Sequence, residues 1–106
     1  MNILIDECLP RKLKFHFKGH SAKTVLVAGW AGKDNGEPLY LAEKEFDIFI
    51  TIDQNIAFQQ NIQAHNIGLI VLALPSNRFG AIIPYISAIK DAINKIKPGQ
   101  LIKIKN

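Results

Sequence analysis

The sequence predicts an α/β protein with a three-layer arrangement, in which helices cover both faces of a mainly parallel sheet of about five strands. Apolar runs such as residues 69–74 (LIVLAL) are nearly continuous, as is typical of strands that are buried on both faces. These runs alternate with segments of helical spacing, which is the pattern of strand–helix–strand units. The chain has 106 residues, 48% hydrophobic and 21% charged, which is close to the common size of one domain. We therefore expect a single domain over residues 1–106.

The first two strands are expected at residues 2–6 (NILID) and 21–27 (SAKTVLV), which are mainly apolar. A helix is predicted between them over residues 9–18, because proline at its second position is tolerated in a first helical turn and Gly19 is a typical helix stop. Residues 28–37 (AGWAGKDNGE) are rich in glycine and polar side chains, which indicates an exposed loop.

The middle of the chain continues this alternation. A second helix is predicted over residues 37–45, followed by a third strand over residues 46–52 (FDIFITI), where β-branched and aromatic side chains predominate. A polar third helix, residues 56–66, then leads to the fourth strand at residues 69–74, which Pro75 terminates.

The last helix is predicted to begin at Phe79 or Ala81 and to run to Lys97, with its isoleucines at helical spacing and Pro84 near its beginning. A proline and a glycine then end it. Residues 101–105 (LIKIK) alternate apolar and basic side chains, which is the pattern of a half-exposed edge strand.

Acidic residues stand where the first and third predicted strands end. Asp6 follows the first apolar run, and Asp53 follows the run FDIFITI. In parallel α/β sheets, ligands bind beyond the carboxyl ends of the strands, where the strand order reverses. Two central strands would bring Asp6 and Asp53 to one cleft, and a right-handed crossover would carry Asp34 and Glu37 to the same edge.

A cluster of carboxylates is the donor set that Mg²⁺ or Mn²⁺ prefers. Two acids about 5 Å apart repel by roughly 3 kcal/mol at an effective dielectric constant of about 20, and a divalent cation neutralises that repulsion. The sequence therefore predicts a Mg²⁺ or Mn²⁺ site, and its candidate members are Asp6, Glu37, Asp53, Asp34 and Asn55.

Each of these residues also has a purely structural interpretation. Asp6 is suited to cap the helix that follows it, and Asn55 is suited to cap the helix after the third strand. Asp34 fits a turn or a helix cap, and Glu37 fits the positive end of the second helix dipole. The sequence alone leaves both interpretations open.

The chain carries 13 lysines and arginines against 9 acids, a net charge of +4, which permits a polyanionic partner without requiring one. Arg11, Lys12 and Lys14 lie on the predicted first helix, soon after Asp6. Basic side chains beside an acidic site favour binding of RNA, whereas scattered lysines more commonly form an ordinary solvated surface.

Other chemistries have weaker support. Cys8 is the only cysteine, which excludes an internal disulfide and fits a reducing, cytoplasmic location. The histidines His16, His20 and His65 share no metal-ligand spacing with Cys8, so neither a zinc site nor a cysteine nucleophile with a histidine partner is expected. The chain has no apolar run of about 20 residues and no signal-peptide pattern, so we expect no membrane partner.

The stretches ILIDECLP, GKDNGEPLYLAEKE and DIFITIDQN, in this order and spacing, resemble the small PIN-like proteins of the DUF5615 family. The likeness extends to IGLIVLALPSNR and so covers nearly the whole chain. It implies a PIN-like ribonuclease, in which acids at the carboxyl edge of a parallel sheet bind Mg²⁺ or Mn²⁺ to cut RNA. Such proteins are often regarded as toxins of toxin–antitoxin pairs.

The resemblance also implies roles for individual residues. Asp6 would be the acid of the first strand, and Glu37 the acid of the second helix, with Asp34 close by. Asp53 would be the acid after the third strand, supported by the hydroxyl of Thr51.

A polar and basic stretch after the fourth strand belongs to the same resemblance. It contains Asn77 and Arg78, and Arg78 would hold the scissile phosphate through two hydrogen bonds or remain a surface arginine. The implied partners are RNA, an antitoxin protein and a second copy of the chain in a homodimer.

Two positions depart from the family pattern, because Cys8 replaces the usual asparagine and Asn55 replaces a common second aspartate. The missing carboxylate favours a second hypothesis, a non-catalytic PIN-like binding module that has an eroded site and acts through a protein partner. A third hypothesis, a receiver-like domain that accepts a phosphoryl group, usually needs a lysine after a later strand, and none stands at the end of LIVLAL. We therefore rank the metal-dependent ribonuclease first.

Overall fold

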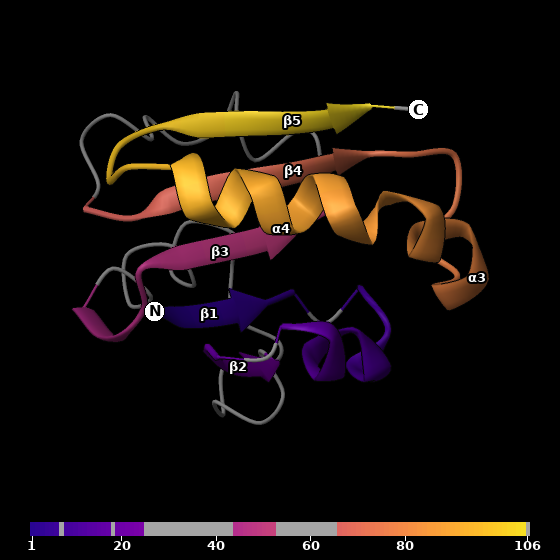
Figure 1. Cartoon of the computed structure of the whole chain (residues 1–106), viewed down its shortest axis with the longest axis horizontal. Coiled ribbons are helices and arrows are strands. Elements are labelled where there is room, and N and C mark those ends of the chain that lie inside the picture. Colours follow the sequence, from indigo (N-terminus) through magenta and orange to yellow (C-terminus); the bar gives the residue numbers. More distant parts are fainter. Residues whose placement is uncertain (7, 18, 25–43, 53–65, 106) are drawn as a thin grey trace.

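The computed structural model describes residues 1–6, 8–17, 19–24, 44–52 and 66–105, and its centre is a five-stranded sheet (Figure 1). Every pair of neighbouring strands is parallel. The predicted α/β sheet is therefore confirmed. Its strands, in the spatial order β2-β1-β3-β4-β5, are β1 (Asn2–Ile5), β2 (Ser21–Thr24), β3 (Ile48–Thr51), β4 (Gly68–Ala73) and β5 (Leu101–Lys105).

The central strands are buried on both faces, as their continuous apolar sequences predict. Along β1, Ile3 and Ile5 point into one layer of the core, while Leu4 belongs to the other layer, and all three are fully buried. In β3, Ile50 and Phe49 divide between the two layers in the same way. A strand whose side chains alternate between two apolar layers needs no polar face, which explains the runs ILI and IFI.

One face of the sheet is covered by the described helices: η1 (Arg11–His16), α3 (Phe79–Ile82), η3 (Ile83–Tyr85) and α4 (Ile86–Lys95). Leu13 of η1 and Ile89 and Ile93 of α4 pack into the same layer as Ile3 and Ile5. The predicted helix at 56–66 and most of the one at 37–45 lie outside the described residues. None of the helices in the described ranges is long and apolar enough to cross a membrane.

The connections β1–η1–β2 and β4–α4–β5 have opposite hands. Their helices pack on the same face of the sheet, but β2 and β5 extend the sheet in opposite directions. Figure 1 shows the usual right-handed path from β1 to β2 and a left-handed path from β4 through α4 to β5. This route places α4 beside the segment that joins η1 to β2.

Two helices differ from the sequence prediction. The helix predicted over residues 9–18 is a six-residue 3₁₀-helix, η1, and the chain turns at Gly19, where φ is 88°. The helix predicted up to Lys97 is divided into α3, η3 and α4, and the last of these ends at Lys95. Pro84 explains the division, because proline lacks an N–H group and clashes with the carbonyl four residues earlier.

The edge strand at the C-terminal end follows the prediction. Among the described strands, β5 pairs with β4 alone, with Leu69 opposite Leu101 and Ala73 opposite Lys105. Ile104 is buried, whereas Lys103 and Lys105 are exposed. Exposed lysines on an edge strand discourage pairing with another chain.

Candidate functional site

The strand order reverses between β1 and β3. From β1 the chain adds β2 on one side and then returns to place β3 on the other side. Beyond the carboxyl ends of two such strands lies the usual ligand position of a parallel α/β sheet. Asp6 follows β1 directly at this point, and Thr51 is the last residue of β3. The structure therefore places Asp6 where the sequence predicts a site.

The carboxylate of Asp6 is held by the neighbouring strand. The backbone N–H of Asp6 donates to the carbonyl of Ile50 at 2.9 Å, which extends the β1–β3 ladder by one residue. The hydroxyl of Thr51 donates to Oδ2 of Asp6 at 2.5 Å. Thr51 is fully buried, whereas Asp6 is partly exposed. A buried hydroxyl thus fixes one oxygen of a carboxylate that is itself partly exposed, so the carboxylate remains accessible to a ligand from solvent.

The structure contradicts the interpretation of Asp6 as a helix cap. The residue that precedes η1 is Pro10, and no side chain caps that end. The backbone carbonyl of Asp6, rather than its carboxylate, accepts a hydrogen bond from the N–H of Leu9 at 3.0 Å. The side chain of Asp6 instead points to β3 through Thr51. A cap for η1 is thus not the reason for an acid at this position.

Cys8 lies beside Asp6, although sequence reasoning gave it no role in the site. Burial raises the pKa of the Cys8 thiol to about 11. The negative charge of Asp6 also raises this pKa, whereas a hydrogen bond from the backbone of Ile52 partly lowers it. At neutral pH the group is therefore a protonated thiol that hydrogen-bonds to the Asp6 carboxylate, rather than a thiolate nucleophile. The only sequence signal for this contact was the spacing of two residues between Asp6 and Cys8.

Asn77 joins the segment after β4 to the same edge of the sheet. Its Nδ2 donates to the backbone carbonyl of Cys8 at 2.8 Å. The next residue, Arg78, is exposed and precedes α3, and its backbone N–H donates to Oγ of Ser76 at 3.1 Å. The predicted position of Asn77 past the fourth strand, on the edge that carries Asp6, is confirmed.

The predicted basic residues of the first helix lie on η1, three to six residues after Cys8. Arg11 and Lys12 are exposed, and the ammonium group of Lys14 lies 5.3 Å from the centre of the Phe15 ring. η1 contacts α3 through the rings of His16 and Phe79, whose centres are 5.4 Å apart. Cations of η1 and the exposed Arg78 before α3 thus come from two elements that touch.

The hydroxyl of Thr51 donates to Asp6. The support of Thr51 for Asp53 that the family resemblance implies involves a residue outside the described ranges. Four predicted members of the metal site, Asp53, Asp34, Glu37 and Asn55, lie outside the described residues.

Asp6 is therefore the one predicted metal ligand that lies among the described residues. Within the ranges that the structure describes, no three His, Cys, Asp or Glu residues are grouped closely enough to hold a metal ion.

Comparisons of the chain with protein-family models, curated proteins and solved structures gave no match.

Proposed function

We propose that this protein is a metal-dependent PIN-like ribonuclease of the DUF5615 type that cuts RNA phosphodiester bonds, with Asp6 as a central residue of its site. The observation that supports this proposal most is the position of Asp6. Its carboxylate stands at the carboxyl end of a central strand, at the point of strand-order reversal, and Thr51 of the adjacent strand holds it. A carboxylate fixed in this way is suited to bind a cation or a proton rather than to cap a helix.

The donor chemistry around Asp6 fits Mg²⁺ or Mn²⁺. Both ions prefer oxygen ligands, and Asp6 offers a carboxylate. In the proposal, Glu37 and Asp53 supply the remaining carboxylates, with Asp34 and Asn55 as further polar groups. A bound metal ion would polarise the phosphodiester and activate a water molecule for attack.

The substrate in this proposal is RNA, held by cations that surround the acidic edge. Arg11, Lys12 and Lys14 lie on η1, and Arg78 precedes the adjoining helix α3. Their charges would attract the phosphate backbone and carry affinity without sequence preference. The resemblance further places the protein as the toxin of a toxin–antitoxin pair, with an antitoxin protein and a second copy of the chain as partners.

Two features favour the non-catalytic alternative, a PIN-like module that binds a protein partner. The Asp6 carboxylate already accepts a hydrogen bond from Thr51 and lies against the thiol of Cys8, so part of its acceptor capacity is in use. In addition, the sequence has an amide at Asn55 where the family commonly has an acid. Both features lower the attraction of this edge for a second cation.

Metal binding and RNA cleavage by the variant Asp6→Asn separate the two functions. The matched control is Asp91→Asn, which removes an exposed acid from α4. We expect the unmodified protein and the Asp91 variant to bind Mn²⁺ in calorimetric titrations and to cleave RNA only with Mg²⁺ or Mn²⁺ present. Asp6→Asn should lose both properties.

The outcomes discriminate clearly. Metal binding that depends on Asp6 but brings no cleavage of any RNA tested would favour the binding module. Cleavage that persists in Asp6→Asn, or in the presence of a chelator, would refute the proposed site. Absence of both metal binding and cleavage in the unmodified protein would refute the ribonuclease proposal.

A further inference from the structure

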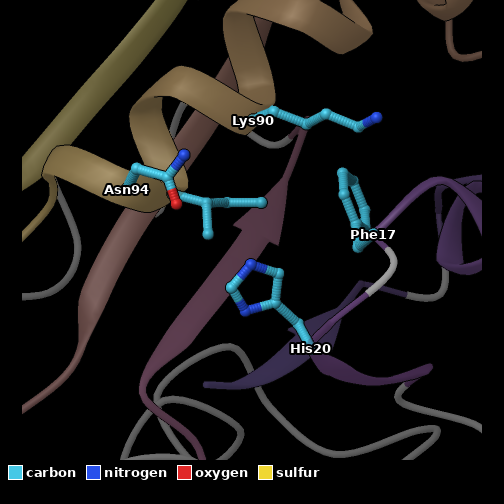
Figure 2. A pocket seen from close by; sticks show the side chains of 5 residues that line it. Phe17, His20, Lys90 and Asn94 are labelled. Atoms are coloured by element: carbon cyan, nitrogen blue, oxygen red, sulfur yellow. The ribbon is translucent and has the colours of Figure 1, made fainter.

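Phe15 is a large aromatic side chain that the fold leaves in solvent. It is 69% exposed, whereas Phe17, two residues later, is 2% exposed and belongs to the core. Figure 2 shows Phe17 at the side of a pocket that Lys90 of α4 also lines. The core therefore uses Phe17 and not Phe15. One exposed apolar side chain is common and indicates nothing alone, so the surroundings of Phe15 decide its meaning.

The exposed side of η1 carries a cation in line with this ring. A 3₁₀-helix has three residues per turn, so side chains three positions apart are eclipsed. Lys12 and Phe15 are therefore on one row of η1, about 6 Å apart along its axis, and both are exposed. Leu13, on a different row, is the residue that η1 buries in the core. Thus η1 turns Leu13 to the sheet and the pair of Lys12 and Phe15 to the solvent.

A second cation contacts the ring itself. The ammonium group of Lys14 lies over the Phe15 ring, 5.3 Å from its centre. A cation is attracted to the negative face of an aromatic ring, and this attraction favours one orientation of the side chain. Because Phe15 is still 69% exposed, most of the ring surface remains open to a further planar group.

A ring beside two cations fits a nucleotide better than it fits a protein surface. Proteins that bind single-stranded nucleic acid stack bases on aromatic side chains and hold the phosphates with basic ones. A protein interface instead has an apolar core of many side chains, in which lysine is depleted. Among the described residues, the exposed large hydrophobic side chains are Met1, Phe15 and Ile83, and only Phe15 belongs to η1.

The position of η1 relates this ring to the acidic edge of the sheet. η1 begins five residues after Asp6, and Figure 1 shows it, as the violet coil after β1, at the end of the sheet to which the strands point. The ring of His16, the residue after Phe15, contacts Phe79 of α3. Phe15 is therefore at the same end of the molecule as Asp6.

We propose that Phe15 is a stacking platform for an unpaired base of single-stranded RNA, with Lys12 and Lys14 at the adjacent phosphates. In a duplex each base is stacked between its neighbours and its faces cannot reach the ring, so this platform selects single strands. The inference rests on the proposed function, since it takes RNA as the ligand. It adds the class of RNA and the residue that recognises it.

Binding without cleavage tests this platform independently of nuclease activity. A fluorescein-labelled oligouridylate of about ten nucleotides is titrated with the protein and followed by anisotropy, with a chelator present to prevent metal-dependent cutting. Phe15→Leu keeps an apolar side chain but removes the aromatic face, and it should weaken binding about fivefold to tenfold, the loss expected for one stacked base. Phe15→Trp should bind at least as tightly as the unmodified protein. The exposure of Phe15 allows both variants to fold.

Salt dependence and two controls separate stacking from other contacts. The slope of log K against log salt concentration should stay unchanged in Phe15→Leu, because stacking releases no counterion, whereas Lys12→Gln should reduce it by about one. Ile83→Ala, which removes an exposed apolar side chain from η3, should bind the oligouridylate as the unmodified protein does. A GC-rich RNA duplex of the same length should bind equally to the unmodified protein and to Phe15→Leu.

Three results would overturn the inference. Equal binding of the single strand by Phe15→Leu and the unmodified protein would exclude a stacked base and leave a protein as the partner of the ring. An equal loss in Ile83→Ala would indicate a general apolar contact. An equal loss of duplex binding in Phe15→Leu would show that the ring acts through the shape of η1. Binding that follows every expectation, from a protein that never cuts RNA, would refute the ribonuclease proposal and leave this inference standing.

Discussion

Replacing Thr51 with valine removes the hydroxyl that donates to Asp6 and keeps the shape of the side chain. The hydrogen bond measures 2.5 Å, and Thr51 is fully buried. A hydrogen bond to a charged group contributes about 1.5–3 kcal/mol to stability. Because Asp6 is partly exposed, water replaces some of this interaction, so we expect Thr51→Val to cost about 1.5 kcal/mol.

This loss is large enough to measure by thermal unfolding. The entropy of unfolding near the midpoint is about 2.1 cal/mol/K per residue, or about 0.2 kcal/mol for each degree in a domain of this size. The Tm of Thr51→Val should therefore fall by about 7 °C. Urea denaturation at neutral pH gives the free energy of unfolding independently of the Tm.

A double-mutant cycle assigns this loss to the pair. In an Asp6→Ala background the acceptor is absent, so Thr51→Val should cost at least about 1 kcal/mol less than in the unmodified protein. The control cycle pairs Thr51 with Asp47, which precedes the opposite end of β3, and its coupling should be near zero. A Thr51–Asp6 coupling below about 0.3 kcal/mol would show that the hydrogen bond does not hold the carboxylate in solution.

Three further predictions concern single residues. Because burial raises the pKa of the Cys8 thiol to about 11 from the usual 9.0, the unfolded chain loses this proton first. The contribution of Cys8 to stability should therefore stay constant below about pH 9 and fall between pH 9 and 11, and Cys8→Ala should lack that part of the fall in urea titrations. Gly68→Ala should cost about 1–3 kcal/mol in the same assay, since its Cβ would lie 2.9 Å from Cγ1 of Ile96, and an unchanged midpoint would show that Ile96 can move aside. Lys14→Glu should weaken RNA binding for all sequences alike and reduce its salt dependence, whereas Lys103→Glu on the edge strand should have a smaller effect; equal effects would place the RNA elsewhere.

The sheet was predictable because its strands carry strong local signals. The runs ILI, IFIT and GLIVLA bury side chains on both faces, and Thr51 is the only polar side chain in them. The alternation in LIKIK identified the edge strand equally well, since Ile102 and Ile104 reach the core on one face while Lys103 and Lys105 are exposed on the other. Each of these signals reflects the burial of consecutive side chains, which depends on little beyond the strand itself.

The helices were predicted less well because their limits depend on proline and on tertiary packing. Pro84 lies near the start of a segment with good helical spacing, yet three short elements form there in place of one. The first helix is a 3₁₀-helix that buries Leu13 and is flanked by the buried Leu9 and Phe17. Apolar residues spaced by four fit either helix type over so short a segment, so spacing alone did not distinguish them.

The candidate site was predictable only in part, because its contacts join distant segments. Asp6 was identified from its position at a strand tip, but its hydrogen bond with Thr51 spans 45 residues of sequence. The bond from Asn77 to the Cys8 carbonyl spans 69 residues. No local pattern encodes such contacts. They follow from strand order, which places β1 beside β3 and thereby brings the two strand tips together.

The way in which Asp6 is held differs from the way in which a helix-capping aspartate is held. A capping aspartate is satisfied by N–H groups of the helix that follows it, which requires only local sequence. Asp6 instead depends on a buried hydroxyl from another strand, and its neighbour Cys8 is fixed by Asn77 from a third segment. Solubility does not explain this arrangement, because any polar residue after β1 could end the strand and allow the chain to turn. Its consequence is a carboxylate with a defined position at the open edge of the sheet, which is the property that a metal ion or a phosphodiester substrate requires.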